Sequence, residues 1–115
     1  MTDVEAGFLY IHNIWWVELE KPKGKNNKDR FVVVVEIFEQ DKAICLSVTG
    51  SNRVTHPKGF DVTINPDANN NLNKVSVVDT MDINIILLSD LKVRKGILSD
   101  EDFNRVYQTY LVAKN

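Results

Sequence analysis

Four consecutive valines, Val32 to Val35, constrain the fold of this chain more than any other feature. β-Branched side chains favour extended backbone, and an apolar run without alternation predicts a strand that is buried on both faces. The run directly follows Arg30 and Phe31, in the stretch KNNKDRFVVVVEI. The sequence therefore places a permanently charged guanidinium at the start of its most buried strand. Arg30 is either a charge that caps a strand at the sheet edge or a functional residue.

The composition is that of an ordinary globular protein. The 115 residues are 43% hydrophobic and 26% charged, which predicts one domain, 1–115, with a substantial core. No apolar stretch reaches the roughly 20 residues needed to cross a bilayer. The N-terminal MTDVEAG lacks the basic region of a secretion signal. We therefore expect a cytoplasmic protein with no membrane contact.

The few chemically reactive side chains exclude several classes of site. The single cysteine, Cys45, rules out an internal disulfide framework and a multi-cysteine zinc site, and its apolar neighbours predict a buried, inert thiol. His12 and His56 have no partner at metal-ligand spacing. The sequence carries no phosphate-binding, dinucleotide-binding, zinc-peptidase or serine-hydrolase motif. We therefore expect neither a metal nor a cofactor.

Charge is distributed unevenly along the chain. The formal net charge is −2, but the segment 21–30 carries +4, which leaves −6 on the remainder. Its cations are Lys21, Lys23, Lys25, Lys28 and Arg30, with Asp29 as the one acid. A basic loop on an acidic body is suited to steering a polyanion to one place. The plainer interpretation is a solvated loop that its lysines keep soluble.

The hydrophobic pattern predicts five or six strands followed by one helix. Strand-like stretches cover 7–19, 30–39, 42–51, 60–64 and 74–80, and 83–91 fits a further strand better than a helical turn. The asparagine-rich stretch 65–73 reads as a mobile turn. A helix is predicted over 99–113, where Ser99 and Asp102 resemble a capping box. Strands at this spacing favour a small bent sheet or barrel closed by the helix.

Two of these elements have informative faces. In the third strand, Ala43, Cys45, Ser47 and Thr49 share one face, and their small side chains allow something to approach the backbone closely. The helix carries an apolar stripe that predicts a core or subunit contact rather than a ligand site. The residues of that stripe are Phe103, Val106, Tyr107, Tyr110 and Leu111.

The order of several segments resembles the MazF/PemK family of toxins, the ribosome-independent endoribonucleases of type II toxin–antitoxin systems. The segments are IWWVELEKPKG, a basic loop, RFVVVV, ICLSVTGSN, KGFDV and KGILSDEDFNRV, and together they span about residues 8 to 112. The resemblance rests on their order, because no single motif is specific. It implies a mainly β (α+β) fold, namely an SH3-like barrel with a C-terminal helix. It also implies a homodimer and an antitoxin that blocks the RNA groove.

The resemblance also implies a site. In that family an arginine at the head of the second strand and a hydroxyl after the third act on the scissile phosphate. These positions correspond to Arg30 and Thr49, with Ser51 and His56 as supporting candidates. Metal-free RNA cleavage passes through a phosphorane with extra negative charge, which a guanidinium fork and a hydroxyl donor would stabilise. The lysines at 21, 23, 25 and 28 would hold the backbone of single-stranded RNA, and Tyr10, Trp15, Trp16 or Phe31 would stack its bases.

The chain also departs from the family pattern. The usual G-D pair near the start is His12-Asn13, and the R-P pair is Arg30-Phe31, which loses the fixed backbone angle of proline. The loop has Lys25-Asn26-Asn27 where some relatives carry a glutamate, so an acid–base partner would have to be His56 or Lys28.

Two alternatives to a nuclease therefore stay open. One is a non-enzymatic inhibitor of a protein, as in gyrase-poisoning toxins of similar fold, which act through a C-terminal helix. The other is a degenerate module that only binds nucleic acid or protein. The retained Arg30 and Thr49 favour the nuclease.

Overall fold

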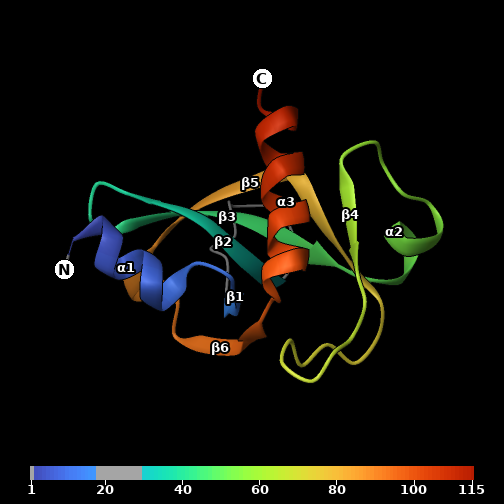
Figure 1. Ribbon diagram of the computed structural model, residues 1–115, viewed down its shortest axis with the longest axis horizontal. Helices are drawn as coiled ribbons and strands as arrows, with labels where there is room; N and C mark the ends of the chain where they lie inside the picture. The colour runs from blue at the N-terminus through green and yellow to red at the C-terminus, as the bar shows by residue number, and fades with distance from the viewer. Residues whose placement is uncertain (1, 18–29) are drawn as a thin grey trace, which may run out of the picture.

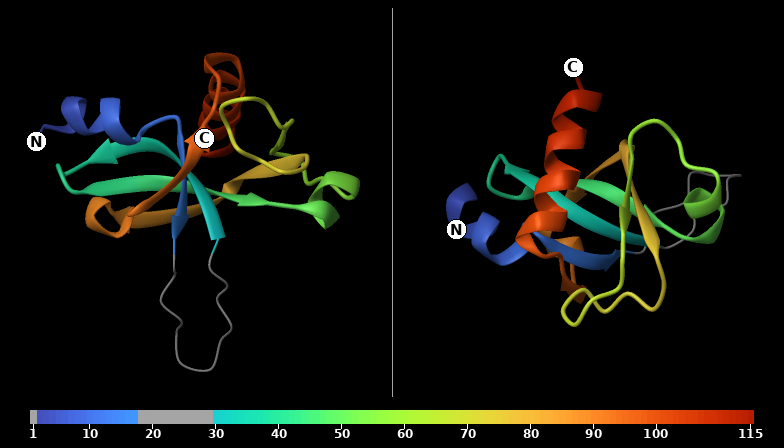
Figure 2. Two further views of the ribbon diagram at one scale, coloured as in Figure 1. Left: turned by 90° about the horizontal axis from the view of Figure 1, so that it is seen from below. Right: turned by 45° about the vertical axis from the view of Figure 1, so that its right-hand side comes forward.

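The computed structural model describes residues 2–17 and 30–115 and contains one six-stranded antiparallel sheet (Figure 1). The order across the sheet is β4-β5-β3-β2-β1-β6. The strands are β1 (Asn13–Val17), β2 (Arg30–Phe38), β3 (Lys42–Thr49), β4 (Asp61–Ile64), β5 (Ser76–Leu87) and β6 (Val93–Ile97). The helices are α1 (Asp3–Tyr10), α2 (Ser51–Thr55), the 3-10 turn η1 (Leu88–Asp90) and α3 (Asp100–Ala113). Figure 2 shows that the sheet curls and that α3 crosses one of its faces. The predicted mainly β fold with a C-terminal helix is confirmed.

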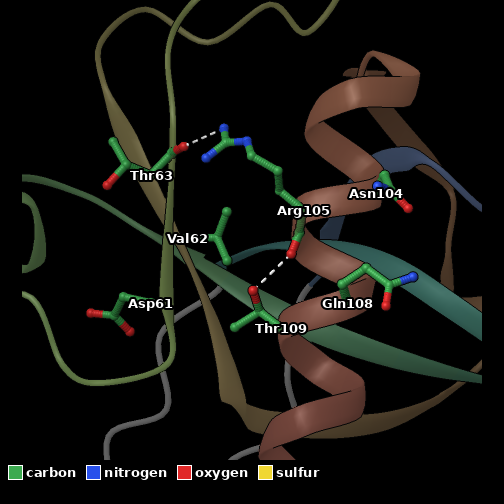
Figure 3. A pocket seen from close by; sticks show the side chains of 7 residues that line it. All are labelled: Asp61, Val62, Thr63, Asn104, Arg105, Gln108 and Thr109. Carbon is green, nitrogen blue, oxygen red and sulfur yellow. Dashed lines mark hydrogen bonds between the residues drawn. The ribbon is translucent and has the colours of Figure 1, made fainter.

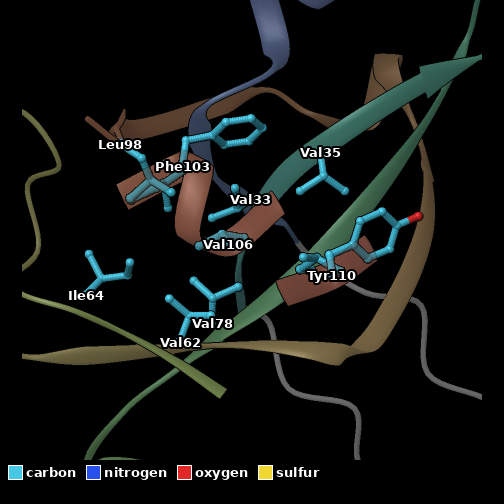
Figure 4. Packing of buried hydrophobic residues seen from close by; sticks show 11 residues of the cluster. Val33, Val35, Val62, Ile64, Val78, Leu98, Phe103, Val106 and Tyr110 are labelled. Carbon is cyan, nitrogen blue, oxygen red and sulfur yellow. The ribbon is translucent and has the colours of Figure 1, made fainter. Parts of the chain in front are cut away.

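The four valines lie in β2, and both faces of that strand are buried as predicted. Val33 and Val35 face α3, whose buried residues Phe103, Val106 and Tyr110 complete the core on that side (Figure 4). Val32 and Val34 face the other way and pack in a second cluster that includes Trp15, Ala43, Cys45 and Ile86. None of the four valines exposes more than 3% of its surface. Burial on both sides of one strand therefore fixes the centre of the sheet.

The predicted first strand is wrong over residues 7–10, which belong to helix α1. A capping box starts this helix, because the Thr2 hydroxyl accepts from the Glu5 amide while the Glu5 carboxylate accepts from the Thr2 amide. Ala6 is fully buried in the second cluster. His12 lies in the following turn with a φ of 71° rather than in a strand. The capping interactions and this burial override the β propensity of the aromatic and branched residues.

Strand β5 is one long strand where the sequence predicted two. Ser47 of β3 pairs with Asp79, and the preceding Leu46 pairs with Ile83, so three residues of β5 bulge out of the ladder. This bulge interrupts the alternation, which is why the sequence predicted separate strands at 74–80 and 83–91. The sixth strand of the sheet is instead β6, which was not predicted.

The predicted turn at 65–73 is a loop organised around Asn70, which is fully buried, and the mobility predicted for it stays a prediction. The Asn70 Oδ1 accepts from the amides of Asp67 and Leu72, and its Nδ2 donates to the carbonyl of Asn65. The predicted third strand also ends early, at Thr49, since residues 51–55 form helix α2. No helix within the described residues is long and apolar enough to cross a membrane.

Candidate active site

Arg30 is the first residue of β2, and its guanidinium lies over neighbouring strands. The Nη1 atom donates to Asp82 Oδ2 at 2.8 Å and to Ser47 Oγ at 3.1 Å. Asn84 Nδ2 donates to the same Ser47 oxygen at 3.1 Å. The Arg30 side chain is 31% exposed. A polar cluster on β2, β3 and β5 therefore holds this arginine, which is more than a charge at a strand end.

The bulge in β5 brings the acid of this cluster into place. Three extra residues shift the register of β5, so that Asp82, Asn84 and the buried Ile86 share the face on which Val32 packs. Asp82 and Asn84 were not predicted as site residues because they lie inside an apolar stretch. The signal was present, since polar and apolar residues alternate in the segment DINI.

Only one edge of the Arg30 guanidinium is used by the described residues, which supply hydrogen-bond partners to Nη1 alone. The Nε atom is buried and has no partner among them. The Nε–Nη2 edge is the pair of parallel donors that binds two oxygens of a carboxylate or phosphate side by side. A buried donor without a partner costs free energy, and an anion at this edge would remove that cost.

Thr49 ends β3 next to Arg30. Phe31 pairs with Val48 and Val32 pairs with Ser47, so the next step of this antiparallel ladder sets Arg30 beside Thr49. Residues two apart share a face, so Arg30, Ser47 and Thr49 lie on one side of the sheet. The structure therefore brings the two predicted catalytic residues together at one end of the β2–β3 pair.

The other predicted site residues are not joined to this cluster. His56 is exposed at the end of α2, where its Nδ1 lies 3.0 Å from Thr55 Oγ1, and no contact in the described part of the chain links it to Arg30. Ser51 begins α2, but its side chain is not among those described. The predicted RNA-binding residues Lys21, Lys23, Lys25 and Lys28 lie outside the described residues.

The aromatic residues divide between core and surface. Trp15 is buried in the second cluster, with Tyr10 tilted against it at 5.2 Å between ring centroids, so Trp15 does not present a stacking face. The side chain of Trp16 is not among those described. Phe31 is half-buried and lines a pocket of about 270 Å³ that Thr49 also lines. As the neighbour of Arg30 in β2, Phe31 faces the α3 side of the sheet, opposite the guanidinium.

A second arginine, Arg53, is paired with acids outside the Arg30 cluster. Arg53 of α2 donates to both oxygens of the Asp61 carboxylate and forms an ion pair with Asp79 at 3.0 Å. The hydrogen bond to Asp61 is the main reason that the pKa of Arg53 is raised. This group connects α2 to β4 and β5, and we assign it a structural role.

A larger pocket, of about 510 Å³, lies between β4 and α3 (Figure 3). Its cation, Arg105, already donates to the carbonyl of Thr63 at 2.8 Å and to Asp102 at 2.9 Å. The Thr109 hydroxyl donates to the backbone carbonyl of Arg105. The cation of this pocket is therefore paired within the fold, whereas Arg30 Nε has no partner among residues 2–17 and 30–115.

Two further observations concern metal and thiol chemistry. Among residues 2–17 and 30–115 there is no group of three or more His, Cys, Asp or Glu side chains that could hold a metal ion. Cys45 is fully buried, and burial raises the pKa of its thiol to about 12. The prediction of an inert core thiol is confirmed.

A curled antiparallel sheet with a C-terminal helix across one face is the fold of a class of small toxins. A solved structure described as an endoribonuclease in complex with its cognate antitoxin, from a mycobacterial species, matches with a TM-score of 0.71. It is 12% identical, and the match covers 91% of this chain and 93% of that one. The Mycobacterium tuberculosis toxin MazF-mt6 matches with a TM-score of 0.67 at 21% identity, over 89% of this chain and 95% of that one. No curated protein sequence matches the chain.

The family follows from the sequence itself. The model of the PemK-like, MazF-like toxins of type II toxin–antitoxin systems matches residues 12–111. This chain belongs to that family, and the resemblance drawn from its ordered segments is confirmed.

Proposed function

We propose that this protein is a toxin that cleaves single-stranded RNA without a metal ion, through attack of the RNA's own 2′-hydroxyl. The observation that carries the proposal is the placement of Arg30: Asp82 and Ser47 hold its Nη1 atom, its buried Nε atom has no partner among the described residues, and its position on β2 pairs with that of Thr49 on β3. A pre-organised pair of charged donors is the device that stabilises charge developing on a phosphate. Such a toxin would act in the cytoplasm, where its substrate is.

The reaction needs no group beyond the RNA, water and these side chains. The 2′-oxygen bonds to the adjacent phosphorus as its proton passes to water, and a phosphorane with an additional negative charge forms. Arg30 would bind two of its non-bridging oxygens, and Thr49 would donate to another oxygen. The bond to the 5′-oxygen of the next nucleotide then breaks, and that oxygen takes up a proton. The products are a 2′,3′-cyclic phosphate and a 5′-hydroxyl end.

The proline missing after Arg30 does not leave the arginine loose. Arg30 pairs with Val17 of β1, and the next residue, Phe31, pairs with Trp16 and Val48 on either side. Pairing on both sides restricts the backbone, while the Asp82 carboxylate orients the guanidinium. Strand pairing and one acid therefore replace the restriction that proline would give.

Two partners follow from the same proposal. The toxin would be a homodimer, and an antitoxin would cover its RNA-binding face. The dimer is supported by a row of exposed apolar side chains on alternate positions of β5, which a soluble monomer rarely presents to water. These β5 residues are Met81, Ile83, Ile85 and Leu87, each 45% exposed or more.

The test is cleavage of a long, unstructured RNA by purified protein in EDTA. We expect defined cuts with 5′-hydroxyl ends, lost in Arg30→Ala and retained in Arg94→Ala, a matched change at an exposed arginine of β6. Arg30→Lys keeps the charge without the fork, and we expect it to lower the cleavage rate by about 100-fold or more. Equal traces from wild type and Arg30→Ala would indicate contamination. RNA binding without any cleavage would contradict the enzymatic proposal.

A further inference from the structure

The pocket of about 270 Å³ lies behind the candidate active site, on the α3 face of the sheet. Its floor is formed by three apolar side chains that pack against the core under α3, those of Phe31, Val48 and Leu72. Phe31 directly follows Arg30 in β2, and successive side chains of a strand point to opposite faces. The sheet therefore separates this pocket from the Arg30 guanidinium.

Two lysines give the pocket positive charge, and no carboxylate among the described residues lines it. Lys95 Nζ is 5.0 Å from the centre of the Phe31 ring, so its charge lies over the aromatic face. Lys74 lies across Gly50, since a Cβ at Gly50 would be 3.5 Å from its Cε and 3.6 Å from its Nζ. Neither lysine has an ion-pair partner within the described residues. An anion in the pocket would therefore meet two positive charges and no acid that repels it.

The pocket is pre-formed, because the loop between β4 and β5, which supplies one lysine, is tied to β6, which supplies the other. Asn71 Nδ2 donates to the carbonyl of Lys95 at 2.7 Å, and the Ile97 amide donates to the carbonyl of Asn69 at 3.0 Å. Buried Asn70 holds the loop from within. A pre-formed hollow loses less entropy on binding than one that must be ordered first.

The volume of the pocket limits its occupant to one ring with a short chain. An apolar cavity of about 150 Å³ holds a benzene ring. A pocket of about 270 Å³ therefore has room for a ring and a few further atoms. A ring without a charge would leave both lysines unpaired, and a small anion without a ring would leave the apolar floor in contact with water.

We propose that this pocket binds a small carboxylate that carries one aromatic ring. The ring lies on the apolar floor, and the carboxylate lies between Lys74 and Lys95. A few convergent polar groups above an apolar lining are typical of a small-molecule site. The inference goes beyond the proposed function and does not depend on it, because neither Arg30 nor Asp82 lines the pocket.

The test is a nuclear magnetic resonance titration of the whole chain with phenylpropionate. We expect the amide signals of Phe31, Gly50 and Lys74 to shift together and to give one dissociation constant. Two matched probes separate the parts of the ligand. Phenylpropanamide keeps the ring without the charge, and acetate keeps the charge without the ring. Each should bind about tenfold more weakly than phenylpropionate or worse.

Variants then assign the binding to the pocket. Lys74→Gln and Lys95→Gln should each weaken phenylpropionate binding about threefold to fivefold and leave phenylpropanamide binding unchanged. Lys92→Gln, at an exposed lysine outside the pocket, is the matched control. Arg30→Ala should not change phenylpropionate binding, since that guanidinium lies on the other face of the sheet. Thermal unfolding curves verify that each variant is folded.

Three results would overturn the inference. Equal affinities for phenylpropionate and its neutral amide would show that the lysines play no part. Binding that is lost in Arg30→Ala but kept in both lysine variants would place the anion on the other face. The third is the absence of a saturable change in the wild-type signals up to about 10 mM phenylpropionate. None of these results bears on the EDTA cleavage assay, which tests the proposed function separately.

Discussion

At the scale of single residues, the charge at the start of the four-valine strand is accounted for by Asp82. This carboxylate accepts a hydrogen bond from Nη1 of the guanidinium, while the Nε atom has no partner in the part of the chain that the structure describes. Asp82 is itself 41% exposed, so water screens the pair and a phosphate is able to approach. Its role is to orient Arg30, and it also repels an incoming phosphate. The two roles act on different kinetic constants.

Replacing Asp82 with asparagine should separate the orienting effect of Asp82 on Arg30 from its repulsion of the phosphate. Asp82→Asn keeps an acceptor oxygen but removes the negative charge, so RNA should bind more tightly and KM should fall. Arg30 should then be held less firmly, and kcat should fall about tenfold or more. Steady-state kinetics on an RNA with a single cleavage site would measure both constants, with Asp90→Asn, at an exposed acid of η1, as the control. An unchanged kcat would exclude the positioning role.

His12 gives the fold a dependence on pH. Its ring stacks on Phe103 at 3.8 Å between centroids, and burial lowers the pKa of His12 below 6.5 despite the nearby Asp100. The unfolded chain therefore binds a proton more readily than the folded one. This contribution to stability is complete above pH 6.5 and is lost as the pH falls below that value toward the lowered pKa.

Replacing His12 with asparagine should remove this dependence. Asparagine tolerates the positive φ of 71° at this position but has no titrating ring. Chemical denaturation between about pH 5 and 7 should give a free energy of unfolding that changes less with pH in His12→Asn than in wild type. Parallel curves for the two proteins would show that His12 does not contribute.

The sequence predicted Arg30 and Thr49 as site residues, a role that stays a prediction, but it did not predict the side chains that hold the arginine. Both residues lie at the ends of strongly patterned strands, where the valine run and the small-residue face define the pairing of β2 with β3. Asp82 reaches the site through a three-residue bulge. A shift of register depends on what the neighbouring strand packs against. The alternation in DINI therefore indicates which residues of β5 share a face, but not which residues of β3 they lie beside.

At the scale of elements, the two faces of β5 carry the two surfaces on which the proposed phosphate site and the proposed dimer rest. The polar Asp82 and Asn84 face Arg30 and Ser47, while the exposed apolar residues of β5 point the other way. A contact between two copies through the apolar row would therefore leave the guanidinium uncovered. The strand explains how a dimer and a phosphate site would coexist.

A charge within the apolar row should prevent the proposed dimer. Ile85 is 64% exposed, so Ile85→Glu should leave the fold intact while placing a charge in the contact. Light scattering after size exclusion should report the mass of a dimer for wild type and of a monomer for Ile85→Glu. Val93→Glu, at a 57% exposed position of β6, is the control and should remain dimeric. A wild-type monomer would contradict the dimer directly.

Helix α1 marks the limit of element prediction from this sequence. Residues 7–10 have strong β propensity, and the single-sequence signal for a helix was only the Thr2–Glu5 spacing at the N-terminus. The predicted stripe of α3 was correct because its apolar residues recur at helical spacing over several turns. Among the side chains of α1 that the structure describes, only Ala6 is buried, and one buried alanine gives no such pattern.

At the scale of the whole molecule, a loop connects the two edges of the curled sheet. Strands β4 and β6 are its edges, and the loop between β4 and β5 hydrogen-bonds to β6 through Asn69 and Asn71. Gly96 makes this approach possible, because a Cβ there would lie 2.4 Å from the carbonyl oxygen of Asn70. The two edges of the curled sheet are thus bridged by hydrogen bonds from this loop, and Gly96 leaves the space that the loop needs.

Adding a methyl group at this contact should open it. Gly96→Ala should lower the free energy of unfolding by about 3 kcal/mol, since the methyl group meets backbone rather than a flexible side chain. Gly59→Ala, where no atom lies within 4 Å of the new Cβ, should change stability by less than about 0.5 kcal/mol. Urea unfolding of the two variants would measure the difference, and equal stabilities would show that the loop does not hold the edges together.

The hydrogen bonds between this loop and β6 should also change their exchange behaviour when RNA binds. Lys74 lies in the loop between β4 and β5, and Lys95 lies in β6. An RNA that contacts both lysines would hold the loop and β6 together, and the hydrogen bonds between them would break more slowly. The Ile97 amide donates to the Asn69 carbonyl and so joins β6 to the loop. Its hydrogen exchange would then slow as RNA binds. Slower hydrogen exchange at the Ile97 amide would therefore report that RNA is bound.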